Sequence, residues 1–182
     1  MNSVTRRSSC YIVMASVAIV VVILDQWSKY WAVHTMLPRM QPGGEGPISL
    51  LGGFLKFIYT ENTGAAFSLG TGVTWIFPLI AIIVAVVIVR LSRNLGSIWW
   101  AVAFGGLLGG LTGNLLDRLT RSPGLGRGYV VDFIQLPNWP IFNVSDMCID
   151  GAAILMVLLT LKGISYRGAP PARELVTPAA EE

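Results

Sequence analysis

The sequence is poor in charged residues, and this deficit bounds its class. Only 13% of its 182 residues are charged, where ordinary globular domains carry about 25%. Hydrophobic residues make up 53%, and the mean hydropathy is +0.63. This balance excludes a typical water-soluble domain and predicts a membrane protein. The net charge is +3, but the basic residues are scattered, so no nucleic-acid partner is expected.

Metal-binding residue types are also scarce. The chain has two cysteines, Cys10 and Cys148, and one histidine, His34. Neither cysteine has a second cysteine or a histidine at the spacing of metal ligands. Because a zinc site needs about four N, S or O ligands, we expect no metal and no cofactor. We interpret the cysteines as small packing residues and the histidine as a polar loop residue.

Long apolar runs are what the sequence does contain. Four of them are long enough to cross a bilayer. The first follows two arginines, as in a secretory signal, but no small-x-small cleavage site comes after it, so we interpret it as a retained span. The predicted fold class is an α-helical membrane protein with four transmembrane helices, at about 11–33, 73–91, 97–117 and 145–163.

The segment between the first two runs predicts a small β-sheet. Residues 34–72 form a long loop, and the stretch from Phe54 to Tyr59 is rich in strand-favouring residues. We expect this sheet to rest on the outer membrane surface. Residues 1–10 are expected to be a short cytoplasmic tail, 11–164 the membrane domain, and the proline-rich 165–182 a disordered cytoplasmic tail.

Basic residues predict the orientation. Two arginines lie in the very short loop 90–96, and short loops obey the positive-inside rule most strongly. Both termini are therefore expected in the cytoplasm. This orientation brings polar groups from separate segments to the outer face, namely Lys29, Asp117, Asp132 and Asp146.

Aspartates beside membrane spans are candidates for function, because ionisable groups are costly there. Asp25 and Lys29 lie four residues apart and share a helix face. We interpret them first as an ion pair that orients a helix, since a paired carboxylate is a poor proton donor. The alternatives are that the pair acts directly in catalysis or that Lys29 contacts a ligand.

The third span carries two patterns. Asn114, Asp117 and Arg118 share one face near its end, and Arg118 is expected either to pair with a carboxylate or lipid phosphate or to snorkel as a helix-end anchor. Earlier in the span, small residues that let membrane helices approach closely recur every fourth position, at Gly105, Gly109 and Gly113. These glycines are expected to pack within one chain or between two.

Asp132 and Asp146 are the candidate catalytic pair. Asp132 interrupts a stretch of β-branched and aromatic residues, whereas Asp146 opens the fourth span and alone would be interpreted as its N-cap. Two carboxylates in low-dielectric surroundings do not both ionise readily, so together they supply a general acid and a general base. Such a pair supports peptide hydrolysis without a metal. Asn62 and Gly64 predict either a site for a ligand backbone or a tight turn.

Five short blocks, in this order, resemble the signal peptidase II family, the bacterial lipoprotein signal peptidases, which are aspartic membrane proteases. The resemblance covers about residues 20–160. The blocks are Asp25-Gln26-x-x-Lys29, Asn62-x-Gly64-Ala65-Ala66-Phe67, Gly109-Gly110-x-x-Gly113-Asn114-x-x-Asp117-Arg118, Val130-Val131-Asp132-Phe133 and Phe142-Asn143-x-x-Asp146.

The resemblance implies four transmembrane helices, an outer β-cradle and a catalytic dyad of Asp132 and Asp146. It implies cleavage of prolipoproteins on the amino side of a diacylglyceryl-modified cysteine, in the bacterial plasma membrane and near the outer leaflet. The partners are then these precursors and membrane lipids, and a monomer is expected. Ser145 departs from the family, where alanine is frequent. The positions that match supporting or site-lining residues are Asp25, Lys29, Asn62, Gly64, Asn114, Asp117, Arg118 and Asn143.

Two other classes compete with a protease. A transporter or proton-coupled channel would use the aspartates as a relay, and should place ionisable residues at several depths. A non-catalytic membrane subunit would use the charge pairs only for packing. The second class does not explain an aspartate in the strand-like stretch around residue 132.

Overall fold

The structure is a computed structural model, and it describes residues 3–64 and 74–168. Its long first helix, α1 (Ser3–Trp31), continues through a π-helical turn, η1 (Ala32–Met36), into α2 (Leu37–Arg39). The helix therefore begins well before the predicted position 11 and runs past 33. No proline interrupts residues 3–37, so the backbone hydrogen bonds continue from the polar start into the apolar run.

Three more helices follow, α3 (Ile76–Ser92), α4 (Ile98–Thr120) and α5 (Val144–Leu161). Among the described residues, three helical segments are long and apolar enough to cross a membrane: Arg7–Arg39, α4 and α5. Helix α3 is apolar but has only 17 residues, at the lower limit of a spanning length. The predicted class, a helical membrane protein with a small sheet, is confirmed.

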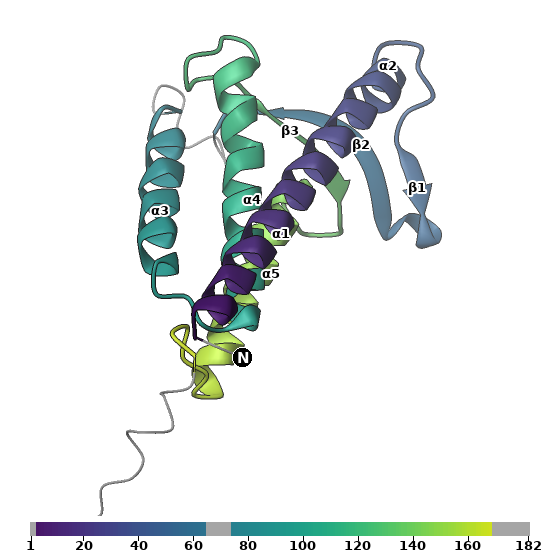
Figure 1. The fold of residues 1–182 in the computed structure, drawn as a ribbon. Coiled ribbons are helices and arrows are strands. Elements are labelled where there is room, and N and C mark those ends of the chain that lie inside the picture. The colour runs from purple at the N-terminus through teal and green to yellow at the C-terminus, as the bar shows by residue number, and fades with distance from the viewer. Residues whose placement is uncertain (1–2, 65–73, 169–182) are drawn as a thin grey trace, which may run out of the picture.

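Helix α4 lies at the centre, with α1, α3 and α5 around it (Figure 1). A Cβ on Gly109 would lie 2.6 Å from Cβ of Val21 in α1, and one on Gly110 would lie 2.6 Å from the carbonyl oxygen of Ser145 in α5. The small residues therefore let two neighbours approach α4 on different faces. The glycine pattern therefore packs helices within one chain, which is one of the two arrangements expected from the sequence.

The sheet has three antiparallel strands in the order β1-β2-β3. They are β1 (Ile48–Leu50), β2 (Leu55–Asn62) and β3 (Val130–Gln135), and the 3-10 turn η2 (Leu51–Gly53) joins the first two. The predicted strand is thus confirmed, although it reaches Asn62. Register places Thr60 opposite Asp132. The sheet packs on the end of α1 through a small core of Ala32, Val131 and Phe133.

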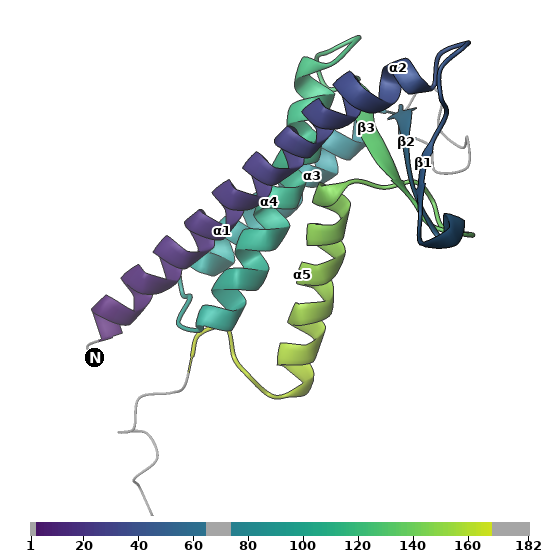
Figure 2. The same cartoon turned by 90° about the vertical axis from the view of Figure 1, so that its right-hand side faces the viewer.

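The first residues of α1 and the last residues of α5 lie at the same end of the helices, and β3 and the start of α5 lie toward the other end (Figures 1 and 2). The segment after α5 turns back beneath the helices. Gly96 N–H donates to the Tyr166 carbonyl at 2.8 Å, and the Trp100 indole donates to the Ile164 carbonyl at 2.7 Å. Residues 165–168 of the predicted disordered tail are therefore ordered by contacts, and 169–182 lie outside the described residues.

Candidate active site

A buried ammonium group organises one side of the site. Lys29 Nζ lies 2.8 Å from Asp25 Oδ2 and 3.0 Å from Asp117 Oδ2, and it donates to Asn114 Oδ1 at 2.8 Å. Lys29 and Asp25 are fully buried. The predicted ion pair is present, with Asp117 as a second carboxylate. Lys29 is enclosed by these partners, so its position favours the supporting role over contact with a ligand.

Asp25 ties α1 to the start of α5. Its Oδ1 accepts the Ser145 backbone N–H at 2.9 Å, while Gln26 donates to Asp25 Oδ2 at 3.0 Å and to the Gly113 carbonyl at 3.1 Å. These donors hold the Asp25 carboxylate in one orientation. The contacts fix the first turn of α5, which carries Asp146, against α1 and α4.

Asp117 ties α4 to the strand that carries Asp132. Arg121 Nε lies 2.8 Å from Asp117 Oδ1, and the Val131 backbone N–H donates to Asp117 Oδ2 at 3.2 Å. Val131 directly precedes Asp132. The carboxylate is therefore shared among Lys29, Arg121 and β3, which places it in a supporting position.

Asp132 is buried with two amide donors on its carboxylate. Asn62 Nδ2 donates to Oδ2 at 2.8 Å, Asn143 Nδ2 donates to Oδ1 at 2.6 Å, and the residue is 2% exposed. Burial and the nearby Asp146 carboxylate raise the pKa of Asp132 to about 6, although the amide donors and Lys29 act to lower it. A carboxyl group in this range can hold or release a proton near neutral pH.

Asp146 belongs to a capping box at the start of α5. Asn143 Oδ1 accepts the Asp146 N–H at 3.1 Å, and Asp146 Oδ2 accepts the Asn143 N–H at 3.1 Å. The interpretation of Asp146 as N-cap is wrong: Asn143 is the cap and Asp146 is the third helical residue. This reciprocal arrangement explains why an Asn-x-x-Asp spacing begins the helix. It leaves Asp146 Oδ1 to accept from Asn114 Nδ2 at 2.8 Å.

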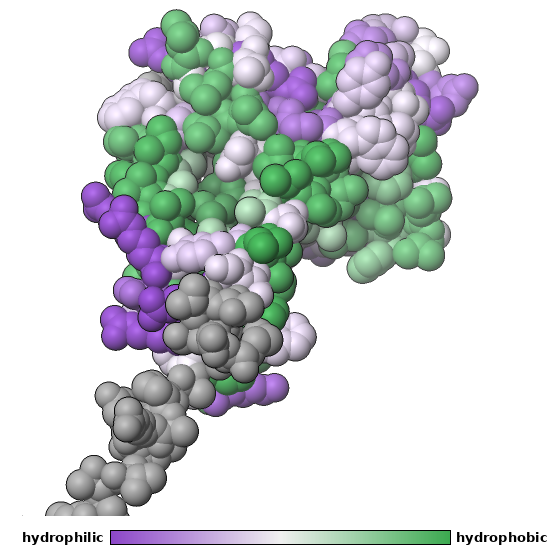
Figure 3. All heavy atoms as spheres, viewed as in Figure 1, coloured by the Kyte–Doolittle hydropathy of each residue, from purple (hydrophilic) through white to green (hydrophobic). Residues whose placement is uncertain are grey.

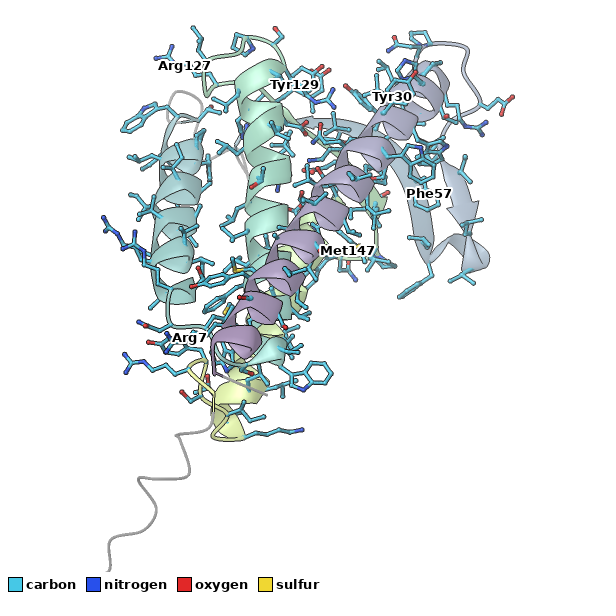
Figure 4. All side chains as sticks on the ribbon, viewed as in Figure 1. Arg7, Tyr30, Phe57, Arg127, Tyr129 and Met147 are labelled. Carbon is cyan, nitrogen blue, oxygen red and sulfur yellow. The ribbon has the colours of Figure 1, made fainter. Side chains whose placement is uncertain are left out.

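Asn143 connects the two candidate catalytic residues. Its side-chain amide donates to Asp132, and its backbone N–H donates to Asp146. The same amide also donates to Asn114 Oδ1 at 3.2 Å. One fully buried residue therefore holds both carboxylates, and Asn114 links them to Lys29. Figure 4 shows the resulting group of oxygen and nitrogen atoms between α1 and α4, below the labelled Tyr129.

Arg118 is buried and binds backbone carbonyls. Its guanidinium donates to the carbonyl oxygens of Asn62 at 3.0 Å and Gly128 at 2.9 Å. The guanidinium carbon also lies 5.5 Å from the centre of the Phe77 ring. Because the residue is 6% exposed, it does not snorkel. It joins the end of β2 to the loop before β3.

Asn62 and Gly64 form a constrained turn at the end of β2. The Gly64 N–H donates to Asn62 Oδ1 at 2.9 Å, which orients the amide so that its nitrogen faces Asp132. Gly64 has φ +113°, and a Cβ there would lie 2.9 Å from the Phe77 ring, so only glycine fits without strain. The tight-turn alternative is present, and it positions Asn62. The rest of this predicted block, residues 65–68, lies outside the described residues.

Three residues of the network were not among the sequence candidates: Gln26, Arg121 and Ser145. For Arg121, the sequence did contain a signal, because Asp117 and Arg121 lie four residues apart on a helix. The contacts of Gln26 and the Ser145 backbone join segments far apart in sequence and had no local signal. In the described part of the chain, no cluster of three His, Cys, Asp or Glu residues could hold a metal ion.

Fold and site together define a small helical membrane protein with two carboxyl groups joined through Asn143 at one end of its helices. Comparison with known families matches residues 17–162 to the family described as signal peptidase (SPase) II. The match covers most of the chain. The protein therefore belongs to the signal peptidase II family, a family of peptidases.

Similar proteins agree with this assignment. A lipoprotein signal peptidase of Mycolicibacterium smegmatis is 44% identical over 153 residues, which is 84% of this chain and 63% of that protein. One from Mycobacterium tuberculosis is 44% identical over the same share of this chain and 73% of its own length. The chain thus spans less than two thirds of the first relative and about three quarters of the second.

Solved structures also resemble it. One bacterial membrane enzyme, determined by the in meso method, aligns with a TM-score of 0.68 at 30% identity, over 82% of this chain and 92% of that one. Another gives a TM-score of 0.69 at 28% identity, over 87% and 93%. The helices and the sheet of the present structure therefore have counterparts in membrane enzymes.

Proposed function

We propose that this protein is an aspartic endopeptidase that removes signal peptides from prolipoproteins, with Asp132 and Asp146 as the catalytic dyad. The bond cut lies on the amino side of a cysteine that carries diacylglycerol. Family membership supports the peptidase activity. The observation that carries the assignment of residues is Asn143, which donates hydrogen bonds to both carboxyl groups.

The proposed reaction needs one protonated and one ionised carboxyl group. The ionised member takes a proton from a water molecule, whose oxygen attacks the scissile carbonyl carbon. The protonated member donates to the carbonyl oxygen, and the tetrahedral intermediate then collapses as the C–N bond breaks and the leaving nitrogen takes up a proton. The raised pKa of Asp132, about 6, allows this residue to hold the resting proton near neutral pH.

The supporting residues keep this pair in place. The side-chain amides of Asn62, Asn114 and Asn143 each donate to one of the two carboxylates without adding charge. Lys29 and Arg121 together balance the charges of Asp25 and Asp117, so these two acids add no net negative charge beside the dyad. A preorganised site of this kind needs little rearrangement when charge develops in the transition state.

We also propose the topology that the family resemblance implied. Helix α3 is the fourth span, both termini are cytoplasmic, and the dyad lies near the outer leaflet. The start of α1 and the end of α5 lie together at the end away from Asn143 (Figures 1 and 2), as an even number of crossings requires. A lipid-modified cysteine sits at headgroup depth, so its protease needs carboxylates at that depth.

A proton relay is supported less well. A relay requires ionisable groups at successive depths of the bilayer. In the described part of the chain, the buried charged residues are Asp25, Lys29, Asp117, Arg118 and Asp132. All of them belong to the network at one end of the helices. A purely structural subunit is supported less well too, because the Asp132 carboxylate is held by amide donors and forms no salt bridge with any residue that the structure describes.

The test replaces each member of the dyad without changing its size. We expect Asp132→Asn and Asp146→Asn each to abolish cleavage of a purified diacylglyceryl-modified precursor in detergent, measured by gel mobility of the product. A loss of acid–base catalysis is expected to lower the rate at least about 100-fold. Both variants are expected to keep a cooperative thermal transition and to bind the precursor.

Asp150→Asn is the matched control, because Asp150 is an exposed aspartate one turn further along α5. It should cleave at the parental rate. Near-parental cleavage by either dyad variant would reject the assignment. Cleavage is also expected to survive dialysis against a chelator, and a loss restored by added metal would contradict a reaction run by two carboxyl groups alone.

A further inference from the structure

The end of the sheet farthest from Asp132 exposes large apolar side chains. They lie on the turn between β1 and β2, where Leu51 is 77% exposed, Phe54 58% and Leu50 42%. Leu51 has φ +51°, an uncommon and strained conformation for a leucine. The turn has the expected glycines, Gly52 and Gly53, but large apolar side chains stand where a water-exposed turn normally has polar ones.

A second turn adds to the same surface. Residues 136–139 follow β3, and Trp139 is 60% exposed. The two turns lie side by side, because together they line a shallow cavity of about 200 Å³. We call this surface, formed by Leu50, Leu51, Phe54 and Trp139, the sheet tip. Clustered apolar residues of this kind mark an interaction surface.

The position of the sheet tip indicates what covers it. In Figures 1 and 2 the η2 end of the sheet extends along the helices, past the first turn of α5 in the direction in which α5 runs. Helix α5 is long and apolar enough to span a membrane and exposes Met147 at 54% and Ile154 at 61%. The sheet tip is therefore level with residues that face lipid. In Figure 3 hydrophobic side chains also continue from the helices to the lower end of the sheet.

The positive charge near the sheet tip also fits a lipid environment. Lys56 lines the cavity between the two turns together with Gln135 and Trp139. Acidic residues of this sheet lie elsewhere: Glu45 precedes β1 near Arg39, and Glu61 is at the other end of β2. One cation beside tryptophan, with leucine and phenylalanine beyond it, matches a phospholipid, with phosphate at the lysine and acyl chains at the apolar residues.

We propose that the sheet tip inserts into the leaflet around the first turns of α5, with Leu51 and Phe54 among acyl chains and Lys56 at a lipid phosphate. The sheet is then anchored at both ends, by α1 through Ala32 and Val131 and by lipid at its tip. Because Asp132 lies in the strand between these anchors, insertion fixes its depth in the membrane. This last consequence depends on the proposed function, whereas insertion itself does not.

The experiment measures depth directly. Both native cysteines are replaced by alanine, Leu51→Cys is introduced, and an environment-sensitive fluorophore is attached. The protein is reconstituted into phosphatidylcholine–phosphatidylglycerol vesicles with or without lipids that carry a quencher on the acyl chain. Glu45→Cys is the matched control, because its side chain is also 77% exposed but precedes β1. Should the cysteine-free protein fail to fold, the native cysteines are kept and their labelling is subtracted.

We expect the label at Leu51→Cys to be quenched by the lipid-borne quencher several times more than the label at Glu45→Cys, and to be protected from aqueous iodide. Equal iodide quenching at both positions would overturn the proposal. Protection from iodide without quenching by lipid would overturn it too, since the tip would then be covered by protein. No step measures cleavage, so the result is independent of the proposed peptidase activity.

Discussion

At the residue scale, Ser145 carries a polar group that its surroundings do not bind. Its Oγ is buried and has no hydrogen-bond partner, although the backbone N–H of the same residue is bound by Asp25. A buried polar group without a partner destabilises the folded state by about 1–3 kcal/mol. The backbone of Ser145 therefore contributes a hydrogen bond to the site, whereas its side-chain hydroxyl contributes none.

We therefore expect Ser145→Ala to raise the free energy of unfolding by about 1 kcal/mol or more, measured as a higher Tm in detergent. The backbone bond to Asp25 does not depend on the side chain. Ser165→Ala is a control, because that hydroxyl is exposed and accepts a hydrogen bond from Arg167 N–H. A lower Tm for the Ser145 variant would mean that its hydroxyl has a stabilising partner.

The titration of Asp132 makes the stability of the folded protein depend on pH. Its pKa is raised from 3.8 to about 6 in the folded protein, so the folded state holds the proton more tightly than the unfolded state does. The stabilisation is complete below pH 4 and is lost as pH rises through about 6. A shift of this size corresponds to about 3 kcal/mol.

We therefore expect the stability of Asp132→Asn relative to the parent to increase between pH 4 and pH 7.5, measured as the difference in Tm at each pH. The comparison between pH values removes any constant effect of the new amide on Asn62 and Asn143. Asp150→Asn, on the surface of α5, should show no such trend. A difference in Tm that does not change with pH would contradict a raised pKa.

Among the elements, α4 makes the close packing possible. Its glycines face two neighbours, since Gly105 and Gly109 lie against α1 and Gly110 lies against α5. Gly113 lies where the two meet, and a Cβ there would be 2.3 Å from Ser145 Oγ and 2.5 Å from Asp25 Oδ2. Such contacts are impossible without movement. The glycine pattern of this helix therefore continues directly into the ion cluster.

We expect Gly113→Ala to lower stability by about 1–3 kcal/mol through overpacking, with a matching loss of Tm, and to disturb the Asp25–Lys29 cluster. Gly151→Ala in α5 is the matched control, because a Cβ at that position meets nothing within 4 Å. It should be neutral or stabilising, since alanine favours a helix. Equal Tm values for the two variants would show that α4 does not approach its neighbours this closely.

At the scale of the whole molecule, the helices have two distinct ends. Figure 4 labels Arg7 at the end where α1 begins and Arg127 at the opposite end, beyond the polar network. Both side chains are exposed. These two positions therefore report the side of the membrane that each end faces.

The proposed topology predicts that only one of them is accessible from outside the cell. With native cysteines replaced by alanine, Arg127→Cys should react with a membrane-impermeant maleimide added to intact cells, and Arg7→Cys should react only after lysis. The readout is the gel shift of the labelled protein. Labelling of Arg7→Cys in intact cells would reverse the orientation and place Asp132 and Asp146 on the cytoplasmic side.

The sequence by itself determined the elements whose signal is local. Apolar runs located the helices to within a few residues because burial in lipid imposes length and composition, although the first helix began earlier and continued through η1 and α2 to Arg39. A stretch rich in strand-favouring residues located β2. The motif blocks indicated the family, and the spacing of Asn143 and Asp146 contained the capping box, even though the cap was assigned to the wrong residue.

Tertiary structure alone decided which of these groups meet. That Asn62, Asn114 and Asn143 converge on two aspartates follows from packing α4 against α1 and α5, and from pairing β2 with β3. It alone also decided that Arg118 binds backbone carbonyls and that Gln26 reaches α4. The physical reason is that most of these contacts join residues 32 to 120 positions apart. Their geometry depends on the distances between helices, which the glycine contacts set in three dimensions.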